Sequence, residues 1–283
     1  MCTKTLGRRI FISSSNETPC YNVGFLDSGI GGLSILAEVA KTCPFQNYTY
    51  LADQKFFPYG DKPGEFLLTR LQSLVPDFIE HHSLDLLVIA CNTASTSALA
   101  SLRSIVGIPI IGVVPAIKPA AEQTSSRQIG ILATPSTIDS QYTKNLIQTY
   151  ASHCKVHLVG SSELVRFAEL KAQGHPADDG IVLESLQLFI QNQVDIIVLA
   201  CTHFPFLRSE LGCQLPPNVR LIDSAQGIAK QVRRTLASLK VRNKVHLKKP
   251  LFISTSDTIS PSELEAAFSY YIAKSSNLPQ ANS

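Results

Sequence analysis

The sequence predicts an α/β protein with two halves of similar fold, each a parallel sheet with helices on both faces. Short apolar runs alternate along the chain with amphipathic stretches, a pattern typical of buried strands and covering helices. The apolar segment around Gly24 is echoed around Gly130, at an offset of 106 residues, and the segment around Cys91 around Cys201, at an offset of 110. Two near-equal offsets in the same order indicate a repeated fold.

The expected strands follow from the apolar runs, and the stretches between them are the expected helices. In chain order the runs are YNVGFL (21–26), YTYLA (48–52), LDLLVIA (84–90), PIIGVV (109–114), QIGILA (128–133), KVHLVG (155–160), DIIVLA (195–200) and VRLID (219–223). The first half is expected to cover residues 20–118 and the second residues 119–225. A C-terminal helix over about 228–275 is expected to pack back onto the first half.

Composition limits the classes of function. The 283 residues are 45% hydrophobic, enough to build a sizeable core in one large domain or two ordinary ones. The 25 basic and 22 acidic residues are spread along the chain, so a nucleic-acid partner is not expected. No apolar stretch approaches the roughly 20 residues that span a bilayer, and the first 20 residues hold too short an apolar run for a signal peptide. The predicted location is therefore the cytoplasm, with no membrane partner.

Cysteine usage argues against a structural role for sulfur. The chain has seven cysteines, an odd number, with no CxxC motif and no regular spacing. Disulfide frameworks and zinc cages normally show such spacing. Free thiols and no metal site are therefore predicted.

Polar residues follow three of the predicted strands. They are the segments Asp27-Ser28-Gly29, Cys91-Asn92-Thr93 and Cys201-Thr202-His203. Ligands of open parallel sheets lie beyond the carboxyl ends of the strands, where helices begin. Each cysteine should therefore lie at a helix N-terminus, a setting that lowers the pKa of a thiol and suits a nucleophile or a base.

The two cysteines have competing interpretations. A lone cysteine at a strand end is more often a small packing residue, but two at matching positions of two similar halves favour a shared chemical role. A metal would need more soft ligands than His203 adds, and a disulfide oxidoreductase would need CxxC. A cysteine hydrolase built on Cys201 and His203 would leave Cys91 unused. Two opposed thiols suit the removal of a proton from one face of a carbon and its return on the other, which is racemisation.

Several motifs between residues 22 and 240 carry a resemblance to a known family. They are GFLDSGIGGLSIL (24–36), FPYGDK (57–62), IACNTAST (89–96), GVVPAIKPAA (112–121), GILAT (130–134), LVGSSELV (158–165), LACTHFPFL (199–207) and LIDS (221–224). Together they resemble the cofactor-independent glutamate racemases of the aspartate/glutamate racemase superfamily. The resemblance implies two pseudo-symmetric doubly wound domains with the active site in the cleft between them. It also implies racemisation of L-glutamate to D-glutamate, which supplies peptidoglycan synthesis, without a cofactor.

The resemblance assigns roles to single residues. Cys91 and Cys201 would be the two acid/base groups, and Asp27 and His203 would each assist one thiol. The implied substrate-binding set is Asp27, Ser28, Tyr59, Gly60, Asn92, Thr93, Thr202 and His203. Packing of Tyr59, and plain helix capping by Ser28 and Thr93, are the structural alternatives.

The form of three motifs, GVVPAIKPA, LVGSSE and CTHFP, resembles the enteric-type racemases, which depend on UDP-N-acetylmuramoyl-alanine as an activator. The implied activator-binding set is Arg103, Gly112, Val113, Val114, Pro115, Ala116, Ile117 and Lys118. Arg103 and Lys118 would pair with a pyrophosphate. The alternative is that both are ordinary surface cations.

The sequence also departs from the family pattern. The segment DQKFFPYG differs from the usual DTARFPYG form at residues 54–56, Phe204 replaces a common tyrosine, and Gly160 stands where many relatives carry a glutamate. Glu163 is the nearest acid to that position and is left out of the catalytic set. An aspartate racemase or decarboxylase of the same superfamily, or a binding protein that has lost turnover, remains an alternative. A monomer and a homodimer are both compatible with the sequence.

Overall fold

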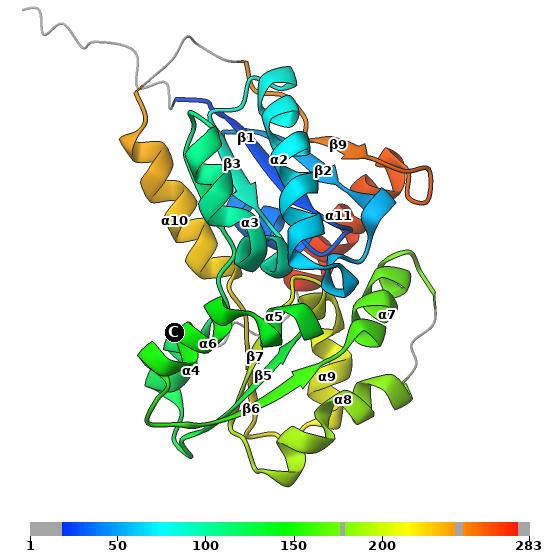
Figure 1. The fold of residues 1–283 in the computed structure, drawn as a ribbon. Coiled ribbons are helices and arrows are strands. Elements are labelled where there is room, and N and C mark those ends of the chain that lie inside the picture. The colour runs from blue at the N-terminus through cyan, green and yellow to red at the C-terminus, as the bar shows by residue number, and fades with distance from the viewer. Residues whose placement is uncertain (1–18, 176–178, 241–245, 277–283) are drawn as a thin grey trace, which may run out of the picture.

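The computed structural model describes residues 19–175, 179–240 and 246–276, which form two lobes, each built on its own parallel sheet (Figure 1). The strands are β1 Asn22–Asp27, β2 Asn47–Ala52, β3 Leu86–Ile89, β4 Ile110–Gly112, β5 Gln128–Ala133, β6 Lys155–Gly160, β7 Ile196–Leu199, β8 Arg220–Ile222 and β9 Leu251–Ser254. The longer helices are α1 Leu33–Thr42, α2 Gly64–His81, α3 Asn92–Ile105, α6 Gln141–Tyr150, α7 Ser162–Ala172, α8 Asp179–Gln191, α10 Ala225–Ser238 and α11 Pro261–Ser276. The short ones are α4 Ile117–Gln123, α5 Pro135–Asp139 and α9 Arg208–Gln214, with 3₁₀ turns η1 Gln54–Phe56, η2 Tyr59–Asp61 and η3 Phe204–Leu207.

The two sheets repeat one strand order. The first runs β4-β3-β1-β2-β9 and the second β6-β5-β7-β8, with every neighbouring pair parallel. Without β9, the order β4-β3-β1-β2 corresponds to β8-β7-β5-β6. The prediction of two similar parallel-sheet halves is therefore confirmed, and β3 and β7 occupy equivalent central positions.

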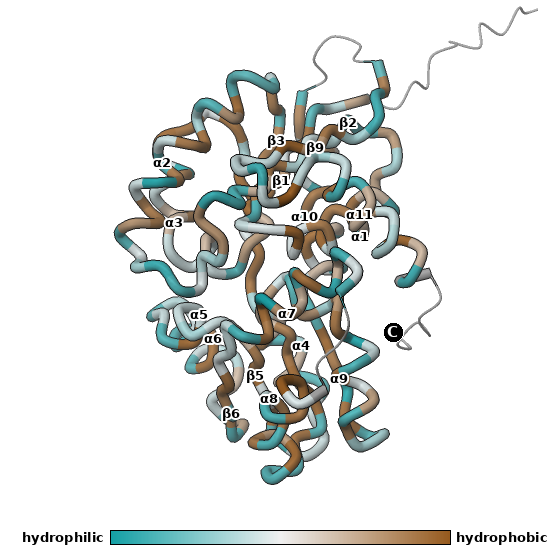
Figure 2. The backbone as a smooth tube through the Cα atoms, turned by 90° about the vertical axis from the view of Figure 1, so that its right-hand side faces the viewer, coloured by the Kyte–Doolittle hydropathy of each residue, from teal (hydrophilic) through white to brown (hydrophobic). Residues whose placement is uncertain are grey.

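The central strands are apolar because helices cover both faces of each sheet. All four residues of β3 and of β7 are buried. Side chains of β1 alternate between faces: Phe25 packs in the core with α1, α10 and α11, whereas Leu26 packs in the core with α2 and α3. In Figure 2 the strands β1 and β3 are mainly brown, whereas the helices around them alternate between brown and teal. Full burial of one such side chain contributes about 1.5–3 kcal/mol to stability.

The C-terminal part of the chain packs on the first lobe. Helices α10 and α11 both lie against α1, and β9 extends the first sheet by pairing with β2. The single helix predicted over about 228–275 is wrong in this respect, because the structure divides that stretch into α10, β9 and α11. The physical reason is the short apolar run LFIS at 251–254, which follows a proline and completes the open edge of β2.

The helix α4 helps to place the division between the lobes. It follows the last strand of the first lobe, β4, and packs against β5 and β7 of the second. We propose that the first domain ends just before α4, near the predicted boundary at residue 118, and that the second ends near residue 225.

Candidate active site

The two cysteines follow equivalent strands. Cys91 comes two residues after the end of β3, and Cys201 comes two residues after the end of β7. Each retains only 6% exposure. Asp27 ends the neighbouring strand β1 and is fully buried. The carboxyl ends of the two sheets thus bring together residues that are far apart in sequence.

Cys91 lies at the N-terminus of α3. Burial raises the pKa of its thiol well above the ordinary value of 9.0, and the charges of Asp27 and Cys201 raise it further. The backbone N–H groups of Ala94 and Thr93 act in the opposite direction. The protonated thiol of Cys91 is therefore favoured, and the helix N-terminus holds the donors that would stabilise a thiolate.

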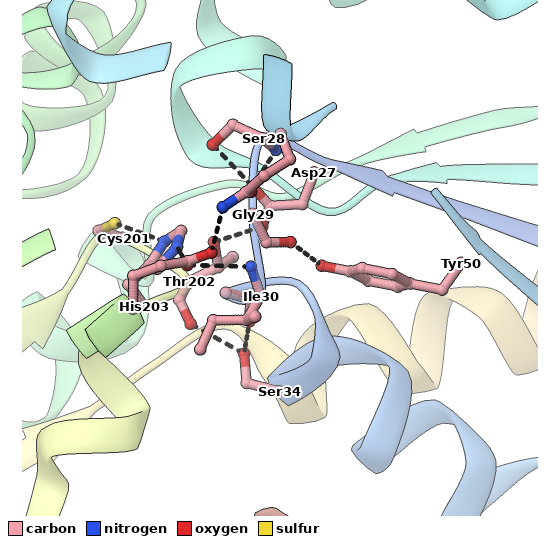
Figure 3. Close-up of polar contacts among 12 residues, drawn as sticks. Asp27, Ser28, Gly29, Ile30, Ser34, Tyr50, Cys201, Thr202 and His203 are labelled. Carbon is pink, nitrogen blue, oxygen red and sulfur yellow. Dashed lines mark hydrogen bonds and ion pairs between the residues drawn. The ribbon is translucent and has the colours of Figure 1, made fainter. Parts of the chain in front are cut away.

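Cys201 is the first member of a chain of three side chains. Its Sγ lies 3.8 Å from Nδ1 of His203, and Nε2 of His203 lies 2.7 Å from Oε2 of Glu169 (Figure 3 shows the Cys201 and His203 side). Burial alone would lower the pKa of His203, but the bonds with Cys201 and Glu169 outweigh it and raise that pKa well above 6.5. The imidazolium form is thus favoured beside the Cys201 sulfur.

The sequence prediction missed Glu169. It lies on α7, is 3% exposed, and accepts hydrogen bonds from the Ile30 N–H at 3.1 Å and from Nε2 of Gln54 at 3.0 Å. Glu163, the acid considered from the sequence, is exposed on the same helix. Helical spacing could have found Glu169, since it falls within the buried face formed by Leu164, Val165 and Ala168.

Asp27 joins the two lobes. Its Oδ2 accepts the hydroxyl of Thr202 at 2.8 Å, and its Oδ1 accepts the Ser28 N–H at 2.5 Å (Figure 3). Burial raises the pKa of Asp27 above 3.8, while the charge of His203 and these hydrogen bonds lower it. Gly31 is needed beside this group, because a Cβ at that position would lie 2.4 Å from Nδ1 of His203.

Asn92 and Thr93 follow Cys91 on α3 and differ in their partners. Nδ2 of Asn92 is buried and has no acceptor among the described residues. A cavity of about 10 Å³, roughly the space of one water molecule, touches Asn92, Cys201 and Thr202. The Thr93 hydroxyl is already bonded across the cleft to Thr134 at 3.0 Å. Of these two side chains, Asn92 is thus the one with a donor left for a ligand.

Tyr59 and Gly60 lie on η2. The Tyr59 hydroxyl donates to Oδ2 of Asp53 at 2.7 Å, and its ring packs in the core of the first lobe. Arg70 and Thr255 bond the same carboxylate, which ties η2 to α2 and to the loop after β9. A Cβ at Gly60 would lie 2.8 Å from the Thr134 side chain, so η2 touches the second lobe closely.

Helix α7 of the second lobe bridges to the first. Ser162 donates to Oδ1 of Asp61 at 2.5 Å, and Arg166 forms an ion pair with the same carboxylate. Glu169, one turn further along the same face, reaches Gln54. In this structure the cleft is therefore closed across the segment from η1 to η2.

The residues implied for the activator do not all lie together. A groove of about 580 Å³ is lined by Arg103, residues 108–112, Val114, Ile228, Gln231 and Thr235. Nε and Nη2 of Arg103 donate to the Ile110 carbonyl. Lys118 lies outside this lining, with Nζ 3.8 Å from Glu122 and over the ring of Tyr150.

The raised pKa of His203 has a measurable consequence for stability. A group whose pKa is higher in the folded state binds more protons there, so its stabilising contribution is complete below 6.5 and is lost as pH rises through the folded value. The free energy of unfolding is expected to fall between pH 6.5 and 9.0, the ordinary values for His and Cys, by up to about 1.4 kcal/mol per pH unit. His203→Asn should flatten this slope in urea titrations at several pH values. An equal slope in the two proteins would mean that groups other than His203 cause the loss of stability.

Within residues 19–175, 179–240 and 246–276, no three His, Cys, Asp or Glu side chains are grouped as a metal site. Over the same part of the chain, no helix is long and apolar enough to cross a membrane.

Comparisons with known proteins agree on one family. Residues 60–232 match the family model described as Asp/Glu/Hydantoin racemase. The chain is 45% identical over 219 residues to the glutamate racemase of Shewanella sp. (strain MR-7), covering 77% of this chain and 80% of that one. It is 44% identical over 235 residues to the glutamate racemase of Aliivibrio salmonicida (strain LFI1238), covering 83% and 88%.

Solved structures give the same answer. Escherichia coli glutamate racemase, in complex with L-glutamate and activator UDP-MurNAc-ala, matches with a TM-score of 0.83 at 36% identity, over 89% of this chain and 96% of that chain. Glutamate racemase isoform RacE1 from Bacillus anthracis matches with a TM-score of 0.75 at 28% identity, over 89% and 94%.

Proposed function

The chain belongs to the Asp/Glu/Hydantoin racemase family, among its glutamate racemases, and on this premise we propose that it interconverts L- and D-glutamate by proton transfer between Cys91 and Cys201. One observation carries the two-thiol mechanism: both cysteines are buried after equivalent central strands, and the charge of Cys201 acts on Cys91. Asp27 lies near Cys91, and the His203–Glu169 pair adjoins Cys201.

The reaction needs one thiolate and one thiol. The thiolate takes the α-proton, and the electron pair of the broken C–H bond passes to the α-carbon and its carboxylate. The opposite thiol then gives its proton to the other face of that carbon. The two sulfurs end with exchanged protonation states, so the enzyme starts from a different state for each hand of glutamate.

The assisting groups fit opposite sides of this exchange. A protonated His203, held by Glu169, would stabilise a Cys201 thiolate at 3.8 Å. Asp27, with its pKa raised by burial, is suited to hold or release a proton near Cys91. Each group thus stabilises the change in protonation of the thiol beside it, a role that water cannot fill in a buried site.

The carbanion needs preorganised donors. Nδ2 of Asn92, which lines a small cavity together with Cys201, has no acceptor among the described residues, and the N-terminus of α3 adds backbone N–H groups. The hydroxyl of Ser28, which donates to Oδ1 of Asp27 at 3.3 Å, would be a further donor. Fixed donors in a buried site stabilise developing negative charge without rearranging. Thr202 would serve by holding Asp27, and η2 by closing the cleft.

The test follows the optical signal of glutamate. Circular dichroism of L-glutamate and of D-glutamate, each incubated with purified protein under reducing conditions, is expected to decay to zero from both sides. Because the two products are mirror images, the equilibrium constant is 1 and kcat/KM must be equal in both directions. Decay with aspartate in place of glutamate would support a sister racemase. No decay with either amino acid would overturn the proposal in favour of a binding protein.

We further propose that the groove at Arg103 binds a nucleotide-linked activator such as UDP-MurNAc-Ala. Its support is the similarity to the E. coli glutamate racemase, which was solved with that activator and with L-glutamate. The groove joins α3, which begins at Asn92, to α10, so a ligand there would contact the helix that carries part of the site. This role would tie D-glutamate supply to peptidoglycan synthesis. The cytoplasmic location stays a prediction.

Arg103→Ala is expected to raise the half-activating concentration of UDP-MurNAc-Ala at least tenfold. A hydrogen bond to a charged group is worth about 1.5–3 kcal/mol, and every 1.4 kcal/mol is tenfold in affinity. Lys118→Ala is the matched control, since Lys118 lies outside the groove lining and should change the half-activating concentration much less. A larger effect of Lys118 than of Arg103 would place the activator elsewhere.

A further inference from the structure

Gln54 is a buried amide at the junction of the two lobes. It begins η1, directly after the first lobe's strand β2 and Asp53, and is only 7% exposed. Its Nε2 donates to Oε1 of Glu169 in the second lobe at 3.0 Å. This is also a position at which the sequence departs from the usual DTARFPYG form.

The two oxygens of Glu169 have different partners. Oε2 accepts from Nε2 of His203 and from the Ile30 N–H. Among the described residues, Oε1 accepts its hydrogen bond from Nε2 of Gln54. The carboxylate is also pressed against the backbone, because a Cβ at Gly29 would lie 2.6 Å from Oε2. The position of the carboxylate therefore depends on the bond that Gln54 donates to Oε1.

The orientation of the Gln54 amide is set by this contact. If the amide were turned over, its oxygen would face the carboxylate and two acceptors would meet. In the observed orientation Oε1 of Gln54 is buried without a hydrogen-bond partner in the described part of the chain. A buried unpaired oxygen is costly, so packing alone would favour an apolar side chain of similar length. The donated bond to Glu169 is what offsets this cost.

We propose that Gln54 is a positioning residue: it holds the Glu169 carboxylate against His203 and so fixes the imidazole beside the Cys201 thiol. The inference rests on the proposed function for its effect on rate. Its structural part, the coupling of Gln54 to His203 through Glu169, stands on the contacts alone.

The charges that face His203 define what Gln54 can change. Glu169 lies on one ring nitrogen and Cys201 on the other, and Asp27 acts on His203 through its charge. The ring of Phe57 packs beside the imidazole at 5.6 Å between centroids. Gln54 itself carries no charge, so its influence on the imidazole passes through the ionised state and placement of Glu169.

The test replaces Gln54 by two side chains of similar length. Gln54→Met removes the donor, and Gln54→Glu adds an acceptor and a negative charge. The titration of His203 would be followed by NMR of protein labelled in its seven histidines, with the His203 signal identified from the His203→Asn spectrum. Gln54→Met is expected to lower the pKa of His203 and Gln54→Glu to raise it. If Gln54 only stabilised the fold, the two substitutions would not be expected to shift the His203 pKa in opposite directions.

Rates are measured alongside as pH profiles of kcat/KM. Gln54→Met is expected to lower kcat/KM about 10- to 100-fold near neutral pH. This is the range expected when a hydrogen bond to a buried charged group, here the Glu169 carboxylate, is lost. Gln46→Met is the matched control, since Gln46 is equally buried at 7% and bonds Tyr21 and Pro19 away from the site.

Two results would overturn the inference. One is a His203 titration unchanged by both substitutions, with or without a loss of thermal stability. The other is a shift of the His203 pKa and a loss of kcat/KM in Gln46→Met that equal those in Gln54→Met. If the unsubstituted protein did not racemise glutamate at all, the proposed function would fail, yet the NMR titration would still decide whether Gln54 acts on His203.

Discussion

Cys91→Ala and Cys201→Ala are each expected to reduce racemisation by about 10⁴-fold or more, to the limit of detection. A positioned acid/base group contributes about 10²–10⁴-fold, and here the missing thiol also removes the only proton donor or acceptor proposed for one face of the α-carbon. Circular dichroism of each hand of glutamate measures the loss.

Each single variant should keep one half-reaction. The remaining thiolate can still remove and return the α-proton on its own face, so exchange of that proton with D₂O is expected for one hand of glutamate only. Proton NMR measures this exchange, and the two variants should prefer opposite hands. Cys213→Ala, which changes an exposed cysteine, is the control. Exchange from both hands in either variant would contradict the assignment of one thiol to each face.

Asp27→Asn is expected to lower kcat/KM by about 10²–10³-fold. Asp27 accepts donors on both oxygens, from Thr202 and from Ser28, so an amide would turn its NH₂ group toward one of these donors. The substitution also removes the carboxylate whose charge acts most strongly on the Cys91 thiol. Coupled racemase assays over a range of pH measure the change.

The control for this variant is Asp195→Asn. Asp195 also accepts several hydrogen bonds, from Thr124, Ser125 and Ser126, but it precedes β7 and so lies at the opposite edge of the sheet from the thiols. A comparable loss of kcat/KM in both variants would mean that Asp27 acts through the fold and not on the proton transfer.

The fold was largely predictable because its strands are buried on both faces. Such strands appear in the sequence as continuous apolar runs, and all eight predicted runs contain strands. The exception is β9, whose apolar run LFIS is short and lies at the edge of the sheet, with Leu251 exposed and Phe252 buried. Its place depends on pairing with β2, about 200 residues earlier in the chain, which no local pattern encodes.

The site was predictable where motifs end strands and less so where helices complete it. Asp27 ends a strand, Cys91, Cys201 and His203 follow strands, and the sheets gather all four. Glu169 lies in mid-helix, where its burial follows from packing of one lobe on the other. The hydroxyl of Tyr59 shows the same limit, since its bond to Asp53 depends on the folded loop.

The closed cleft has a consequence for binding. The Asp61–Arg166 pair and the Ser162–Asp61 bond join the two lobes across the cleft, so any widening of the cleft at this edge to admit glutamate breaks both. Substrate therefore binds a conformation that the free protein visits only part of the time, and the apparent dissociation constant is the intrinsic one divided by that fraction. Weakening the Asp61–Arg166 pair would raise the open fraction and speed product release, while leaving the proton-transfer groups themselves intact.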